Sequence, residues 1–79
     1  MTTETIAMPS GLVNTITTAT VQGRKIEIIL QDATKSDVPS NKHMVCTRSN
    51  GQPVHNVPFA TLAEAKAQYD KMVSQLAAH

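Results

Sequence analysis

The chain has 79 residues, with seven Lys and Arg against six Asp and Glu, and a formal net charge of +1. This length predicts one domain with a thin core, and the near balance of charge disfavours nucleic-acid binders, which carry a basic face. Hydrophobic residues make up 41% and aromatic residues only 3%, so the core must be largely aliphatic. A core this small is often supplemented by self-association or by docking on a partner, so a homodimer is one expectation.

The single cysteine, Cys46, cannot form an intramolecular disulfide. This is typical of a reducing compartment, and we expect a cytoplasmic protein. The first ten residues have no basic region followed by an apolar run, so we expect no signal peptide. The apolar run from Ile28 to Leu30 is far too short to span a membrane, so no membrane association is expected.

The N-terminal half predicts a flexible tail followed by a β-hairpin. Residues 1–11 are polar and end in a Pro-Ser-Gly cluster, so we expect a flexible tail before a single domain over residues 12–79. The window Leu12 to Val21 is rich in Thr, Val and Ile, which favour a pleated strand. Lys25 to Gln31 alternates apolar and polar residues, which predicts a second strand. Its apolar face carries Ile26, Ile28 and Leu30.

The turn between these two strands leaves two registers open. A two-residue turn at Gln22-Gly23 sets Thr17 opposite Ile28, whereas a three-residue turn sets Ile16 opposite Leu30. The second register gathers the apolar residues better, but the pattern alone fixes neither.

A polar stretch from Asp32 to Asn41 predicts a loop, and a second hairpin follows it. Asn50-Gly51 is a strong hairpin signal because both residues of a two-residue turn take positive φ. It joins a strand over His43 to Arg48 to a strand over Val54 to Phe59. With Asn50-Gly51 as the central pair, Arg48 lies opposite Pro53, Cys46 opposite His55 and Met44 opposite Val57.

The prolines of the last strand constrain where that strand lies. Pro53 falls in a non-hydrogen-bonded pair, where the N–H that it lacks would point outward, so this strand must lie at an edge of the sheet. Pro58 falls where an N–H is needed for pairing. We therefore expect pairing to end near Val57.

The stretch from Thr61 to Leu76 predicts an amphipathic helix. Thr61 and Glu64 form a capping box, in which the hydroxyl accepts from the N–H of Glu64 and the carboxylate reaches the N–H of Thr61. Beyond the cap, apolar residues recur at spacings of three and four, which places them on one helix face. These residues are Leu62, Ala65, Tyr69, Met72, Val73 and Leu76.

Together these elements predict an α+β fold, a small antiparallel sheet of three to four strands (β-β-β-β-α) with one C-terminal helix packed across one face. The covered face is expected to carry Ile26, Ile28, Leu30, Met44, Cys46, Val57 and Phe59. The other face stays open, as antiparallel sheets allow, and is the candidate partner-binding surface. Its predicted residues are Lys25, Glu27, Ile29, His43, Val45, Thr47 and Asn56.

Only one pair of residues suggests chemistry. Cys46 and His55 face each other in the predicted register, and a Cys beside a His can be an activated nucleophile or half of a zinc site. No third orienting group accompanies them, so a small buried hydrophobe is the preferred interpretation of Cys46. His43, His55 and His79 do not form a spaced metal motif, and there is no Gly-rich phosphate loop. We therefore predict a protein that is not an enzyme, with no catalytic residue, cofactor or metal.

One resemblance concerns the C-terminal third. Arg48-Ser49-Asn50-Gly51, a short strand, and then Phe59 to Ala65 are similar to the strand-to-helix junction of the arm-type DNA-binding domains of phage integrases. The resemblance covers Arg48 to Leu76 and implies a sheet that enters the major groove with a helix behind it. The Arg and Lys side chains of that family's sheet are reduced here to Arg48, with Lys42 before the preceding strand.

A second resemblance concerns the whole chain. In size and composition it resembles small accessory proteins of phages and mobile elements, of which anti-CRISPR proteins are one class. This resemblance implies a protein that occupies a surface of a larger machine without chemistry of its own.

The leading hypothesis is a non-enzymatic module that binds a larger host protein or complex, or itself, through the open face. Ile29 and Val45 would form an apolar island there. The most concrete version is an anti-CRISPR-like phage inhibitor. The alternative is DNA binding through the same sheet, with phosphate contacts from Arg24, Lys25, Lys42 and Arg48.

Overall fold

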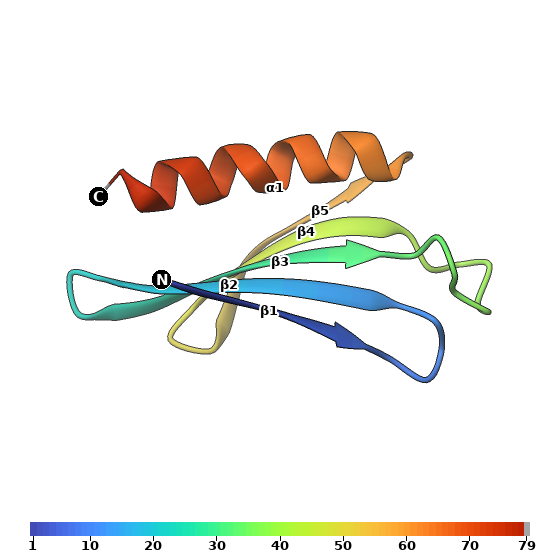
Figure 1. The fold of residues 1–79 in the computed structure, drawn as a ribbon, viewed down its shortest axis with the longest axis horizontal. Helices are drawn as coiled ribbons and strands as arrows, with labels where there is room; N and C mark the ends of the chain where they lie inside the picture. Colours follow the sequence, from blue (N-terminus) through green and yellow to red (C-terminus); the bar gives the residue numbers. More distant parts are fainter. Residues whose placement is uncertain (79) are drawn as a thin grey trace.

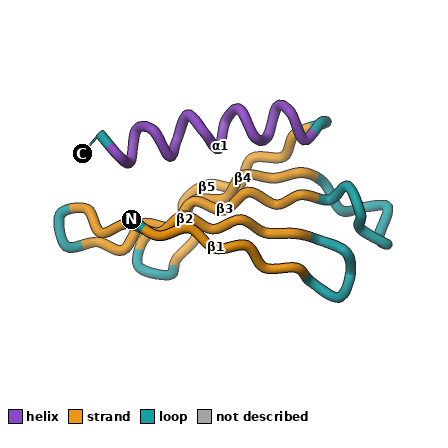
Figure 2. The backbone as a smooth tube through the Cα atoms, viewed as in Figure 1, coloured by secondary structure: helices purple, strands orange, loops and turns teal. Residues whose placement is uncertain are grey.

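Five strands and one helix make up the computed structural model, which describes residues 1–78 and leaves His79 outside the described part. The strands form one antiparallel sheet in which each pairs with its neighbours in sequence. The helix lies across one face, and no described element covers the other (Figures 1 and 2). The predicted α+β fold is confirmed. The elements are β1 (Thr2–Ala7), β2 (Val13–Val21), β3 (Arg24–Asp32), β4 (His43–Ser49), β5 (Gln52–Phe59) and α1 (Leu62–Ala77).

The fifth strand, β1, lies where the sequence predicted a flexible tail. It pairs with β2 along its whole length, from Thr2 opposite Thr18 to Ala7 opposite Val13. That prediction was wrong because an edge strand needs no apolar face. Every residue of β1 is exposed, so it is held mainly by its backbone ladder, which hydropathy does not reveal.

The turn between β2 and β3 resolves the register that the sequence left open. Gln22 and Gly23 both have positive φ, 51° and 77°, as a two-residue hairpin turn requires. Thr17 therefore lies opposite Ile28, and Ile16 lies opposite Ile29.

The β4–β5 hairpin contains a β-bulge that the sequence analysis missed. Asn50 and Gly51 form the expected turn, and Arg48 faces Pro53 as predicted. The register then shifts, so that Thr47 faces His55 and Val54 is the additional residue. A bulge adds one residue to one strand, so each later residue of that strand pairs one position away from the partner that an unbroken ladder gives it.

This shift corrects two predictions made for an unbroken ladder. Cys46 lies opposite Asn56 rather than His55, and pairing continues to Phe59 instead of ending near Val57. Because antiparallel pairs alternate between hydrogen-bonded and non-hydrogen-bonded, the extra residue also moves Pro58 to a non-hydrogen-bonded pair. Its missing N–H then faces the free edge.

Thr61 caps the N-terminus of α1 as predicted, and its hydroxyl accepts from the backbone N–H of Glu64 at 3.2 Å. The Glu64 carboxylate accepts from the Thr61 hydroxyl at 3.3 Å, in place of the predicted bond from the Thr61 N–H. Within the described residues, no helix is long and apolar enough to cross a membrane.

The core lies between α1 and the middle strands. Ala65 is fully buried and Tyr69 is 8% exposed, and they pack with Ile28, Leu30 and Val45. Each large aliphatic side chain buried in this way contributes about 1.5–3 kcal/mol. Phe59, Met72, Val73 and Leu76 surround this cluster.

Three hydroxyl groups cross the core beside these apolar contacts. Thr17, only 1% exposed, shares a hydrogen bond with the Tyr69 hydroxyl and another of 2.9 Å with the Thr3 hydroxyl. A buried hydroxyl needs such partners, because an unpaired one costs about 1–3 kcal/mol. These three hydroxyl groups therefore link β1, β2 and α1 where apolar contacts are few.

Two loops meet at the end of the sheet away from the β2–β3 turn. The backbone N–H of Asp37 donates to the carbonyl of Ser10 at 2.9 Å. Gly11 has φ of +93°, and a Cβ there would overlap the carbonyl oxygen of Lys35. Only glycine accommodates both the positive φ and the close approach of Lys35. This contact therefore fixes how the β1–β2 connection meets the long loop.

Gly11→Ala is expected to destabilise the fold more than Gly51→Ala. Gly51 also has positive φ, +83°, but nothing lies within 4 Å of its Cβ position. Its replacement should cost about 1–2 kcal/mol from backbone strain alone. Gly11→Ala should cost at least about 1 kcal/mol more, since the two loops must separate and lose a hydrogen bond. Urea unfolding of both variants measures this difference, and equal losses would contradict the loop contact.

Tyr69→Phe is expected to lower stability by about 0.5–1.5 kcal/mol, because it removes one buried hydrogen bond and little volume. Thr17→Val removes the other partner with similar shape. If the two hydroxyl groups interact as described, the double variant should lose about 1 kcal/mol less than the sum of the single losses. Strictly additive losses in urea unfolding would show that the hydroxyls do not interact.

Candidate functional site

Alternation along the strands assigns every sheet residue to one of two faces. Ile28, Leu30 and Val45 pack under α1, so residues one step away, such as Ile29 and Cys46, point to the opposite side. We call that side the open face.

An apolar row runs across the open face through three neighbouring strands. Ile16 lies opposite Ile29, and Ile29 lies opposite Cys46. Ile29 is only 6% exposed although no helix covers it, because the side chains around it on the sheet shield it. Ile16 and Cys46 are half-buried. Met44 and Ile6 lie diagonally next to this row, and Ile6 is 42% exposed.

Polar and charged side chains surround this apolar row. Glu4 and Asn56 extend it at its two ends, opposite Ile16 and Cys46 respectively. In the next row of the ladder, Glu27 and Arg48 lie directly opposite each other. The open face therefore has an apolar centre and a rim that carries both signs of charge.

The predicted partner-binding residues divide between the two faces. Lys25, Glu27, Ile29 and Asn56 do lie together on the open face. The predicted open-face placement of His43, Val45 and Thr47 was wrong, because these side chains lie on the helix side.

Val45 shows the reason for this error. It is 2% exposed, packs with Tyr69 and lies opposite Val57. An unbroken ladder had placed Met44 opposite Val57, and the bulge reverses that assignment. Met44 and Cys46, predicted for the covered face, consequently lie on the open face.

Several residues of the open face were therefore not predicted from the sequence. One available signal was the two-residue turn, since that register places Ile16 beside Ile29. A second was the spacing of Pro53 and Pro58, which only a bulge allows at two outward-facing positions. The missed residues are Ile6, Ile16, Met44, Cys46 and Arg48.

The structure does not place Cys46 and His55 together. His55 faces Thr47 on the helix side, whereas Cys46 points to the open face. Burial raises the pKa of the Cys46 thiol, and Arg48 only partly opposes that effect. A raised pKa leaves less thiolate at neutral pH, which is the reverse of an activated nucleophile.

His43 belongs to a hydrogen-bonded cluster at the end of β3 rather than to a binding surface. Its Nδ1 accepts from the N–H of Ala33 at 3.1 Å and lies 3.7 Å from Oδ1 of Asp32. Hydrogen bonds from the side chain and from the backbone N–H of Thr34 lower the pKa of Asp32, and the nearby His43 adds a smaller effect in the same direction. This cluster holds the start of the long loop against β4. Among residues 1–78, no three His, Cys, Asp or Glu side chains are grouped so as to hold a metal ion.

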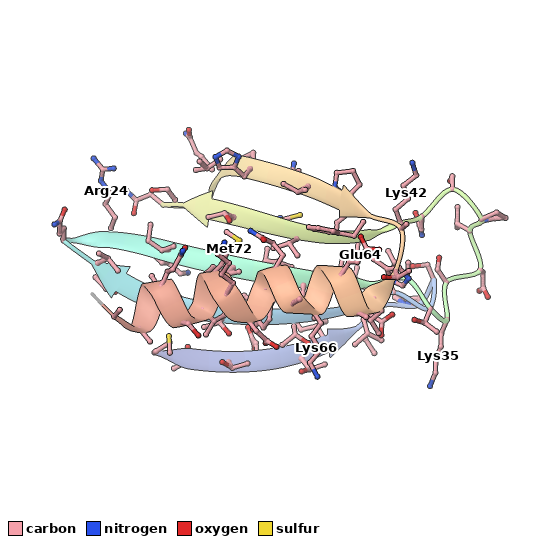
Figure 3. The ribbon with its side chains drawn as sticks, turned by 90° about the horizontal axis from the view of Figure 1, so that it is seen from above. Arg24, Lys35, Lys42, Glu64, Lys66 and Met72 are labelled. Carbon is pink, nitrogen blue, oxygen red and sulfur yellow. The ribbon has the colours of Figure 1, made fainter. Side chains whose placement is uncertain are left out.

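The four basic residues proposed as phosphate contacts do not form one patch. Arg24 and Lys42 lie at opposite ends of the molecule (Figure 3). Lys25 and Arg48 share the open face with Glu4 and Glu27. The sheet thus lacks the continuous basic surface that follows a phosphate backbone.

Comparisons of this chain with protein-family models, with curated proteins and with solved structures found no match.

Native Cys46 is expected to react with iodoacetamide at pH 8 at least about tenfold more slowly than Cys46 in the urea-unfolded chain, because burial limits both thiolate and access. Since the folded state holds the thiol proton more tightly, stability should also fall as pH rises above about 8.5, the ordinary thiol pKa. Cys46→Ser should remove that fall. Alkylation rates and urea unfolding between pH 7 and pH 10 test both effects, and equal rates in both states would contradict the burial.

Proposed function

We propose that this chain is a non-enzymatic protein-binding module and that its open face is the partner-binding surface. The observation that carries this proposal is the apolar row Ile16, Ile29 and Cys46 on a sheet face that no described element covers. An apolar centre within a polar rim is the arrangement of many protein interfaces. A partner of complementary shape would remove this row from water without breaking any backbone pairing.

The most concrete form of the proposal is an inhibitor of the anti-CRISPR kind, encoded by a phage or mobile element, that occupies a surface of a larger host complex. Such an inhibitor acts by covering a surface, so it needs a stable platform and no reacting groups. A face that carries both signs of charge suits a protein partner better than a nucleic acid, because a phosphate backbone repels Glu4 and Glu27. Action inside a host cell would also suit the unpaired thiol of Cys46.

The partner-binding test uses two variants that change the charge equally. Lys25→Glu with Asn56→Glu alters two exposed positions of the open face. Lys66→Glu with Ser74→Glu alters two exposed positions of α1 and is the matched control. In pull-downs from host lysate, the open-face variant should retain at least tenfold less of the wild-type partner, about 1.4 kcal/mol. The α1 variant should retain it fully.

The same proteins test the inhibitor form of the proposal. Wild-type protein expressed in bacteria with a CRISPR system directed at a phage should restore plaque formation, and the open-face variant should not. Circular dichroism must show that both variants are folded. A folded open-face variant that still captures the partner would refute the surface assignment. Undiminished CRISPR immunity across a panel of system types would refute the inhibitor.

Val45→Glu cannot serve in this test, although Val45 was predicted for the partner surface. Val45 is 2% exposed beneath α1, so a carboxylate there would be buried without a partner and would unfold the domain.

A further inference from the structure

We propose that β1 is a self-pairing edge: two copies of this chain join β1 to β1, antiparallel and about a two-fold axis, so that their sheets become continuous. This inference goes beyond the proposed function and does not depend on it. The partner is a second copy of this chain, and the surface is a row of backbone groups rather than the open face.

The free backbone groups of β1 follow from its register. The two-residue turn makes Val21 and Arg24 a hydrogen-bonded pair, so even-numbered residues of β2 point their backbone groups toward β1. The N–H of Met8 donates to the carbonyl of Leu12, which agrees with this alternation. The outward-facing residues of β1 are therefore Thr3, Thr5 and Ala7, each with a free N–H and a free carbonyl.

The opposite edge of the sheet is blocked. The non-hydrogen-bonded positions of β5, whose backbone groups face outward, are Pro53, Asn56 and Pro58. Proline has no N–H, so only Asn56 offers a donor there. Prolines and a bulge are devices by which proteins prevent pairing at an edge. β1 has neither, and its six residues are all exposed.

Only one register pairs all three outward residues of β1 with those of a second copy. With the axis at Thr5, Thr5 pairs with Thr5 of the second copy, and Thr3 pairs with Ala7 in both directions. Moving the axis to Glu4 leaves Ala7 unpaired and sets the two Glu4 carboxylates directly opposite each other, which is destabilising. The charge of Glu4 thus disfavours the Glu4 register, and the pairing of all three outward residues selects the Thr5 register.

The side chains also fit this pairing. In the Thr5 register, Ile6 lies opposite Glu4 of the second copy and diagonal to Ile6 of the second copy. Two apolar side chains, each 42% exposed in the single copy, therefore come together. On the helix side, Thr3, Thr5 and Ala7 are free of α1, which packs on β3, β4 and β5. Neither face of β1 therefore obstructs the sheet of a second copy.

The contrast between the edges also limits the assembly to two copies. Pairing β1 of one copy with β5 of the next would build an open filament, and the prolines of β5 oppose it. Pairing β1 with β1 uses the free edge of both copies, so the assembly is closed at two copies. A joint of about six residues is smaller than a standard interface, so we expect reversible dimerisation with a dissociation constant on the order of 0.1 mM.

Sedimentation equilibrium on the wild-type chain and two proline variants tests the pairing. Thr5→Pro removes an outward N–H that the single copy does not use, so it should keep the fold and weaken dimerisation at least tenfold. Asn56→Pro makes the equivalent change at the opposite edge and should dimerise like wild type. The proposal is overturned by a wild-type chain that stays monomeric at about 1 mM, by a Thr5→Pro protein that dimerises normally, or by an Asn56→Pro protein that does not.

Cross-linking tests the register and covers the case in which Thr5→Pro fails to fold. In a Cys46→Ser background, Thr5→Cys should form a disulfide dimer on mild oxidation, because the two Cα atoms would lie about 5.5 Å apart. Glu4→Cys should cross-link at least tenfold more slowly, since its Cα atoms would lie about 8 Å apart, beyond disulfide reach. Equal or faster cross-linking through Glu4→Cys would overturn the Thr5 register.

Discussion

The structure depends on one geometric constraint: a single helix must provide the core for five strands. A helix with its side chains is about 10 Å wide and strands lie about 4.8 Å apart, so one helix covers only two or three strands. α1 contacts β3, β4 and β5, and its two buried residues, Ala65 and Tyr69, lie over the middle of the sheet. The Tyr69 hydroxyl extends this hold sideways through Thr17 to Thr3. The outer strands receive no comparable burial, so their properties are set by their backbone groups and by water.

Because of this constraint, the surfaces that α1 leaves uncovered are the ones that can indicate how the protein binds a partner. No described element lies above Ile29, so its neighbours on the sheet must shield it. It is only 6% exposed. The open face therefore keeps an apolar row that a partner can cover. On the helix side, Ile28, Leu30 and Val45 are already used by the core.

The sequence predicted the local elements well and the relations between them less well. The helix could be predicted because its cap and its period lie within one stretch, Thr61 to Leu76. The faces of β4 could not be assigned from hydropathy alone, because one extra residue at Val54 in β5 changes which β4 residues share a face with Val57 and Phe59. The prolines did hold that information. Pro53 and Pro58 must both lie at outward positions, which recur every second residue, so their odd spacing requires a bulge between them. β1 was missed for another reason. Its six residues make a strand only because β2 offers its free backbone groups beside them, and no local pattern records that.

The two proposed surfaces are independent, and that independence determines how they would combine. β1 pairs through backbone groups in the plane of the sheet, whereas the open face lies above that plane. Dimerisation would therefore leave both open faces free and bring them onto the same side of one continuous sheet. Two weak contacts with a partner that repeats its own surface would then act together, and the second would form at a high effective concentration. A larger complex built from repeated subunits is the kind of partner for which this arrangement gains most. A chain confined to one copy by Thr5→Pro would still bind such a partner through its single open face, but without that gain.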